Sequence, residues 1–437
     1  MRSQAMRTVG FGLLLIQLIF AHAAEAALIG PDDPWTRDQW ERESEKRVEE
    51  AFPDAWPRWQ KNPSTLGGRA GFSAVVSGKS PAYPYGYGAV PRGRSGVRIY
   101  ASITGRGWEV QPSFVHLNAP EHGSKDAPDG SALALDTGNW TLFAGWVPQW
   151  WGPGWEGSLL LSQAARPRPT VGAILRGTFF GSHGWEARTF LARLEHNRPV
   201  PNPLHWGLRL TARVHEKFTL SLSRVAQICG KNRPCGLGQW GKMLMGLDNA
   251  GQGGITYSNQ PGNQLGGISF RWRSPVGQKD YALYLQGAGE DEAGKLPSRW
   301  FWLAGTELWG DSWRGFIEYA DTRAKAWYAK PELGTVYNHG VYRMGYRVWN
   351  RPLGYILDGD SRMLSAGGLG SIGDYHWLLV VRHWKRERSP VKRWQSQVHL
   401  RLKWPFSRSI RLEAQAAIGD SGWASLMISM DQDMVWK

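Results

Sequence analysis

The chain has 437 residues, with 52 lysines and arginines against 37 aspartates and glutamates, 26 tryptophans, 54 glycines and two cysteines. The net charge of +15 favours a polyanion or an anionic surface as partner. After the first residues no apolar run is long enough for a spanning helix, and the mean hydropathy is negative, which excludes a helical membrane protein.

Residues 1–26, MRSQAMRTVGFGLLLIQLIFAHAAEA, have the pattern of a secretory signal peptide. Two arginines flank the start, an apolar run extends from Val9 to Phe20, and small residues follow, so we expect cleavage near residues 23–26. The run is too short for a membrane anchor. Because an exported chain seldom meets nucleic acid, we expect an anionic polysaccharide and no nucleic acid as partner.

One helix is predicted near the start of the mature chain, over residues 33–53. Asp33 can cap it, Pro34 suits its first turn, and Pro53 ends it. Its apolar stripe is thin, so we expect a docking helix. The Pro- and Gly-rich segment PAYPYGYGAVPRG (81–93) predicts a loop or plug segment.

From about residue 97 the hydrophobic period changes to two, with one apolar face and one polar or basic face. The apolar positions include Trp206, Leu208, Leu210, Ala212 and Val214; Phe218, Leu220 and Leu222; Ile268, Phe270 and Trp272; and Val398, Leu400, Leu402 and Trp404. A soluble sandwich alternates in the same way, so this pattern alone leaves both folds open.

Three further features favour a transmembrane β-barrel. They are the signal peptide, the many strands of about 9–11 residues, and aromatic residues near strand ends, as in RWFWLAGTELWG (299–310). At roughly 20 residues for each strand and turn, positions 70–437 would hold about 18 strands. We therefore predict an all-β fold, an antiparallel barrel of about 18 strands, in the outer membrane.

The segment QWWGPGWEGSLLLSQAARPRP (149–169) combines aromatic rings with cations. A sugar ring can pack on tryptophan while arginine holds hydroxyl or carboxylate groups. Candidate polysaccharide-binding residues are therefore Trp150, Trp151, Trp155, Arg166 and Arg168. The alternative is that these tryptophans form an interfacial girdle or fill the lumen.

Signals for catalysis and for metal binding are weak. Acidic residues cluster in GEDEAGKLPSR (289–299), EYAD (318–321) and LDGDS (357–361), where a solvated loop or an ion-pair network is the simpler interpretation. No GxSxG motif occurs, and the DGD triplet lacks the remaining calcium ligands. We expect no enzyme activity, no cofactor and no metal.

The two cysteines, Cys229 and Cys235 in CGKNRPC, predict a small disulfide loop at an extracellular loop or strand end. Two thiols alone make a poor metal site.

The tryptophan-rich segment resembles the signature of the capsule assembly Wzi family. Further segments fit in the family's order: GNWTLFAG (138–145), LEHNRPVPNPLHWGLRL (194–210), LSLSRVAQ (220–227), PGNQLGGISFRWR (261–273), GEDEAGKLPSR (289–299), EYADT (318–322), YNHGVYRMGYR (337–347) and ILDGDS (356–361). Arg198, Glu290 and Asp291, which lie in two of these segments, complete the candidate binding set.

The resemblance implies an 18-strand outer-membrane barrel with a lectin-like activity, closed at its periplasmic mouth by N-terminal helices. Residues 27–70 would then be a short helical plug and residues 71–437 the barrel. The chain departs from the family signature at Gln149, where arginine is usual, and at Gln163 and Ala164, where asparagines are usual.

The predicted function is non-catalytic retention of an acidic capsular polysaccharide or related exopolysaccharide by a monomeric barrel embedded in outer-membrane lipid. The alternatives are a porin-like channel that exports polysaccharide or solute, and an outer-membrane hydrolase. A lumen closed by helices and filled by loops would exclude the channel.

Overall fold

A computed structural model describes residues 66–77 and 95–436, with gaps at 119, 121–122, 138, 148, 180–182, 216, 248–253, 257, 261, 278–280, 294–295, 311–312, 326–329, 374, 408–409 and 421. The predicted signal peptide, the helix at 33–53 and the segment 81–93 lie outside the described residues. The first strand begins at Leu66, which corrects the barrel boundary expected at residue 71. None of the helices in this part of the chain has the length and apolar character that a membrane crossing requires.

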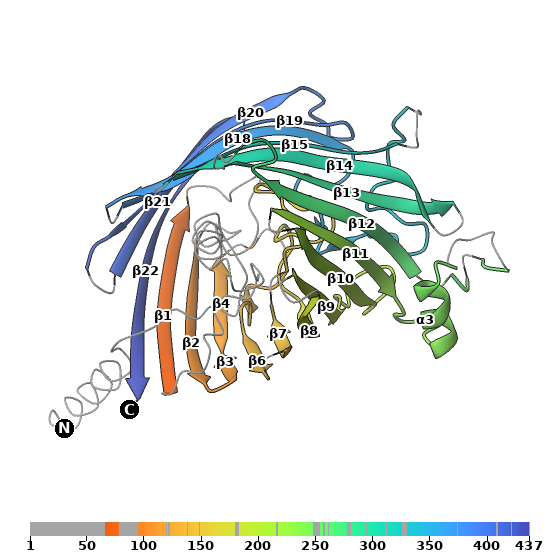
Figure 1. Ribbon diagram of the computed structural model, residues 1–437, viewed down its shortest axis with the longest axis horizontal. Coiled ribbons are helices and arrows are strands. Elements are labelled where there is room, and N and C mark those ends of the chain that lie inside the picture. The colour runs from red at the N-terminus through yellow and green to blue at the C-terminus, as the bar shows by residue number, and fades with distance from the viewer. Residues whose placement is uncertain are drawn as a thin grey trace.

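The strands form one closed ring, shown in Figure 1. In chain order they are β1 (Leu66–Ser77), β2 (Ser95–Gly105), β3 (Trp108–Gln111), β4 (Ser113–Asn118), β5 (Asp126–Ala127), β6 (Ala132–Asp136), β7 (Trp140–Trp146), β8 (Pro169–Phe179), β9 (His183–Arg193), β10 (Leu204–His215), β11 (Phe218–Ile228), β12 (Gly262–Arg273), β13 (Tyr281–Ala293), β14 (Leu296–Trp309), β15 (Trp313–Lys325), β18 (Ser361–Ile372), β19 (Tyr375–Arg386), β20 (Gln395–Pro405), β21 (Ile410–Gly419) and β22 (Trp423–Trp436). Two further elements are not strands of the ring: the helix α3 (Leu237–Leu244) and the hairpin of β16 (Arg347–Val348) and β17 (Arg351–Pro352).

The ring contains eighteen antiparallel strands among the described residues, because β3 with β4 and β5 with β6 each act as one interrupted strand. β3 and β4 pair with opposite halves of β2, and β6 and β5 pair with them in turn. Pro112 separates β3 from β4, since proline has no N–H for the ladder. β1 pairs with β22 and closes the ring. The predicted architecture and strand number are confirmed.

The two faces of the wall differ as the alternation predicted. On β20, Leu400 and Leu402 are both 42 % exposed on the outer face, whereas His399 and Arg401 on the inner face are at most 3 % exposed. An outward apolar band around a closed barrel is the surface that lipid requires, because lipid cannot hydrogen-bond to polar side chains. The polar and basic face lines the lumen.

The two ends of the barrel also differ. Short connections such as Arg106–Gly107 lie at the end where β1 begins and β22 stops. Longer connections, at 147–168, 194–203, 229–261 and 326–360, lie at the opposite end, which we call the long-loop end. In outer-membrane barrels the short turns face the periplasm and the long loops face outward.

Candidate functional site

The segment that carries the tryptophan signature folds into the lumen. We call residues 149–168 the first lumen loop; its three leucines at 159–161 are all 0 % exposed. Close packing needs glycine here, because a Cβ on Gly157 would lie 2.5 Å from the ring of Tyr355. The loop therefore belongs to the packed interior.

Trp155 is held by two buried carboxylates of the wall. Its backbone N–H donates to Glu318 Oε2 at 2.6 Å, and its indole N–H donates to Glu307 Oε2 at 2.8 Å. Its ring stacks on Phe316, with centroids 5.3 Å apart and planes at 7°. At 5 % exposure, the ring has the protein's own side chains where a sugar would have to lie.

Trp151 is buried beside it and is 1 % exposed. The side-chain amide of Gln286 donates to the Trp151 carbonyl at 2.7 Å and accepts from the Leu159 N–H at 2.9 Å. One wall residue thus fixes two points of the loop. Trp150 differs, since it is only half-buried and its indole N–H donates to the carbonyl of Gly152.

A second segment, residues 330–360, which we call the second lumen loop, packs against the first. The Tyr337 hydroxyl donates to the Leu159 carbonyl at 2.6 Å, and the Tyr337 N–H donates to Glu290 Oε1 at 2.7 Å. Burial raises the pKa of Tyr337 well above its ordinary value, so the hydroxyl keeps its proton and remains a donor. The Ser162 N–H donates to the Leu353 carbonyl at 2.8 Å.

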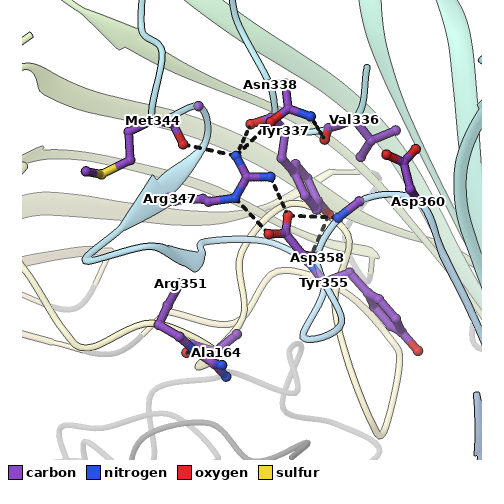
Figure 2. A network of polar contacts seen from close by, with 12 residues as sticks. Ala164, Val336, Tyr337, Asn338, Met344, Arg347, Arg351, Tyr355, Asp358 and Asp360 are labelled. Carbon is purple, nitrogen blue, oxygen red and sulfur yellow. Dashed lines mark hydrogen bonds and ion pairs between the residues drawn. The ribbon is translucent and has the colours of Figure 1, made fainter. Parts of the chain in front are cut away.

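Arg347 organises the second lumen loop from its centre, as Figure 2 shows. Its Nε and Nη2 form a fork to the two carboxylate oxygens of Asp358, at 2.7 and 2.8 Å. Its Nη1 donates to the carbonyls of Tyr337 and Met344 and to Oδ1 of Asn338, at 2.9 to 3.0 Å. One guanidinium therefore donates hydrogen bonds to backbone carbonyls that would otherwise be buried without a donor.

Arg198 connects the β9–β10 loop to the same block. Its Nη1 donates to the Arg347 carbonyl at 3.0 Å and its Nη2 to the Gly345 carbonyl at 3.1 Å. Burial lowers the pKa of Arg198, although the nearby Glu195 opposes this shift. The Oε1 atom of Glu195 accepts the backbone N–H of Trp349 at 3.1 Å. Arg198 thus joins the β9–β10 loop to the second lumen loop by hydrogen bonds.

The two arginines of the signature are also internal. Arg166 pairs with Asp129 through Nε and Nη2, both at 2.8 Å, and donates to the Ser124 carbonyl at 2.6 Å. Arg168 is 7 % exposed, and burial lowers its pKa to about 10. Among the described residues, Nε of Arg168 has no hydrogen-bond partner.

Most of the predicted site residues are therefore members of one packed block. Trp151, Trp155, Arg166, Arg168, Arg198 and Glu290 are buried in it. The side chain of Asp291 lies outside the described set. The departures from the family signature, Gln149, Gln163 and Ala164, are buried as well, so they alter the packing of the block. A direct contact of these residues with polysaccharide stays a prediction.

A different segment carries aromatic and cationic groups that are exposed. We call residues 387–394, between β19 and β20, the rim loop. Trp394 is 39 % exposed and stacks on His383, with centroids 4.7 Å apart and planes at 6°. The side chains of Arg388 and Arg393 are 60 % and 73 % exposed, and Lys392 is exposed too. The combination of cations and tryptophan is visible in the sequence RSPVKRW (388–394), but this stretch lies beyond the segments that resemble the family.

The tip of the β16–β17 hairpin carries an unusual backbone. Trp349 and Asn350 have φ angles of 48° and 61°, the left-handed pair that a two-residue hairpin turn needs. Asparagine tolerates this region, but a bulky tryptophan adopts it only at a cost. The Glu195 carboxylate holds the Trp349 N–H from the β9–β10 loop, and Gly123 approaches its ring from the β4–β5 loop. The tip thus lies between loops of the long-loop end.

Exposed charge at the long-loop end is mostly positive. The exposed cations described there are Lys125, Arg193, Lys231, Lys242, Lys330, Arg343, Arg388, Lys392 and Arg393. The exposed acids described there are Asp126, Glu332 and Asp420. Within the described ranges, no group of three or more His, Cys, Asp or Glu side chains is placed to hold a metal ion.

Comparisons with known proteins agree with this architecture. The outer-membrane protein Wzi of Escherichia coli, described as a carbohydrate-binding β-barrel involved in group 1 capsule assembly, has a similar structure with a TM-score of 0.73. Its sequence is 21 % identical, and the match covers 94 % of each chain. OccK5 (OpdH) of Pseudomonas aeruginosa gives a TM-score of only 0.46 at 10 % identity, over 85 % of this chain and 98 % of that one.

An uncharacterised 55.8 kDa protein of the cps region of Klebsiella pneumoniae is 30 % identical over 265 residues. The match covers 57 % of this chain and 52 % of the relative, so the chain matches about half the length of that protein. The model of the family described as capsule assembly protein Wzi matches residues 84–427. The chain therefore belongs to the capsule assembly Wzi family.

Proposed function

We propose that this protein is an outer-membrane barrel that binds acidic capsular or related exopolysaccharide at the cell surface and retains it there. It acts by binding, without catalysis. Its family and its fold, shared with a barrel described as carbohydrate-binding, support this function. The long-loop end faces outward, as in other barrels of this membrane.

The observation that carries the proposal is the block of two packed lumen loops beneath the basic surface of the long-loop end. The two lumen loops hydrogen-bond to each other and to the wall through Gln286, Glu290, Glu307 and Glu318. A polymer is then held on the long-loop end, where cations exceed acids. Several weak contacts along one chain add up, because each bound segment raises the local concentration of the next.

Two features of the long-loop end are the proposed contacts: the exposed rim loop, and the hairpin tip with its partly buried Trp349. The rim loop offers the exposed cations Lys392 and Arg393 to a polymer with carboxylates, beside Trp394, whose ring is packed by His383 and Arg362. The hairpin tip offers Trp349 and the exposed amide of Asn350. A polymer that touches both features would cross the mouth of the barrel.

The alternatives find less support. A porin-like channel needs an open passage, whereas the described loops pack apolar side chains inside the barrel against β13, β14 and β15. A hydrolase needs carboxylates that are available to substrate, but Glu290 and Asp358 are engaged by Tyr337 and Arg347.

The test is binding of alginate, a polyuronate, and of uncharged dextran to the purified barrel in detergent, at several salt concentrations. Lys392→Glu should weaken alginate binding several-fold at low salt and reduce its salt dependence, because exposed charges act through screened attraction. The matched control is Arg106→Glu, which makes the same charge change at the end opposite to the long-loop end. Equal loss in both variants, or loss in neither, would contradict the proposed surface.

A further inference from the structure

The helix α3 lies outside the barrel, beside the wall and next to β11 and β12 (Figure 1). It follows a disulfide that joins Cys229, at the end of β11, to Cys235. The disulfide brings the start of the helix to the rim of the long-loop end.

One face of α3 packs on the outer surface of the wall. Met243 is 0 % exposed and clusters with Ala226 and Ile228 of β11, while Trp240 packs on the same cluster. Leu204 and Trp206 of β10 complete the contact. These wall residues share the parity of the exposed Leu210 and Leu222, so they lie on the face that the barrel turns toward lipid.

The C-terminal end of α3 is held by Arg224 of β11, which lies four residues before Ile228 on the same strand. Arg224 donates through Nη2 to the Met243 carbonyl at 2.8 Å and through Nη1 to the Leu244 carbonyl at 2.9 Å. Its Nε donates to Gln264 on β12. An arginine at the last carbonyls satisfies groups that a helix end leaves free.

The dimensions agree with a helix that descends along the wall. Eight residues of helix span about 12 Å. Four residues of strand, from Ile228 to Arg224, span about 13 Å. The C-terminal end of the helix therefore lies within reach of Arg224, two residues along β11 from Leu222, which is 51 % exposed in the apolar band.

Other side chains of this segment, away from the wall contact, are apolar and exposed. Leu237 is 91 % exposed, Leu244 51 %, Met245 58 % and Leu247 40 %. Lys242 on the same helix is exposed. Four apolar side chains on an external segment only 11 residues long would be costly in water.

We propose that α3 is an interfacial anchor whose free face, formed by Leu237 and Leu244 of the helix and by Met245 and Leu247 just after it, inserts among the acyl chains of the outer leaflet. Lipid is the occupant because the helix is held next to the wall's own lipid-facing surface. Arg224, which binds the end of α3, is two residues along β11 from Leu222, and Leu222 pairs with the exposed Leu210 and Ile268. Lys242 then lies at the level of anionic headgroups, as in interfacial helices.

The anchor sets how deep the barrel sits on the side of β10 and β11. A helix held by a disulfide at one end and by Arg224 at the other cannot drift from the wall. Its apolar face resists both sinking and rising, because either movement exposes apolar groups to water or buries Lys242. This role requires neither the rim loop nor the hairpin tip, which are the two contacts proposed for the polysaccharide.

The experiment places nitroxide labels on single added cysteines and measures their collision rates with oxygen, which concentrates in lipid, and with a neutral nickel complex, which stays in water. The full chain is reconstituted in phosphatidylcholine vesicles with its disulfide intact. Met245→Cys and Leu247→Cys report the anchor. Leu222→Cys is the lipid reference, and Leu333→Cys, 51 % exposed in the second lumen loop, is the water reference.

Labels at 245 and 247 should give oxygen-to-nickel ratios close to that at 222 and several-fold above that at 333. Ratios at both positions equal to that at 333 would overturn the anchor and leave the free face for a protein partner. All four sites are exposed, and heat-modifiable migration on gels verifies that each labelled variant is folded.

Discussion

The first lumen loop and the rim loop contain the same kinds of residue in opposite environments. Each combines tryptophan, arginine and proline within a short stretch. Trp155 is 5 % exposed and lies against Phe316, whereas Trp394 is 39 % exposed. Arg166 lies buried against Asp129, whereas the Arg393 side chain is 73 % exposed even though it pairs with Asp420.

The difference shows that composition does not decide exposure. What decides it is whether the facing strands supply acceptors. β14 and β15 supply Glu307 and Glu318, which accept both N–H groups of Trp155 inside the barrel. A polar group that finds such a partner can be buried, because the partner replaces its hydrogen bonds to water.

Replacing each tryptophan by alanine should separate the two regions most strongly. We expect Trp155→Ala to lower the free energy of unfolding by about 3–5 kcal/mol, because it leaves a cavity. It also leaves Glu307 without the indole donor. Trp394→Ala should cost only about 1 kcal/mol, the value of an exposed ring contact.

Urea titration of the barrel in lipid vesicles measures both values. Equal costs would mean that the rim loop is packed as tightly as the lumen loop, and the comparison would fail.

The arginines should differ in the same direction. Arg166→Met should cost about 3–5 kcal/mol, because it leaves the Asp129 carboxylate buried without its cation. Arg393→Met should change stability by less than about 1 kcal/mol, as for an exposed ion pair. The same titration compares them, and the double variant Arg166→Met with Asp129→Asn should recover part of the loss. If the double variant recovers no stability, loss of the ion pair does not explain the effect of Arg166→Met.

A smaller effect should appear with pH. Burial, and then the charge of Arg233, lower the pKa of His339 to about 4, against an ordinary value of 6.5. Its Nδ1 accepts the N–H groups of Val341 and Tyr342, each at 3.1 Å, which requires the unprotonated ring. Between these two pKa values the unfolded chain binds a proton that the folded chain refuses. Stability is then complete above pH 6.5 and falls as the pH drops toward 4.

Unfolding titrations at several pH values should show that His339→Gln flattens this dependence. His196→Gln, at an exposed position of the β9–β10 loop, serves as the control. If the slope with pH is the same in the parent and in the His339 variant, the proton is taken up elsewhere.

Much of the fold could be predicted because lipid imposes a simple rule on the sequence. Every second residue of a spanning strand must be apolar, and the alternation around Leu210 and Leu400 follows this rule directly. The strand number followed from length. The barrel boundary was misplaced because β1, with residues such as Gly67, Gly68 and Gly71, alternates too weakly to show its start at Leu66.

The candidate site was harder to predict, because burial in the lumen depends on contacts between distant residues. Trp155 and Glu318 are separated by 163 positions, and Leu159 and Tyr337 by 178. No local pattern reports such pairs. The sequence favoured Trp155 as a ligand contact on residue type alone, with lumen packing as the alternative, and the structure places the ring in the lumen.

The connection between the two lumen loops also has a mechanical meaning. A polymer anchored at the long-loop end would pull on the hairpin tip whenever the surrounding fluid moves. That tension would pass from Trp349 to Arg347 and Asp358, then through Tyr337 to Leu159, and finally to the wall at Gln286. Because Glu290, Glu307 and Glu318 hold the same two loops from three neighbouring strands, the pull is also spread over the wall, and no single loop has to resist it alone.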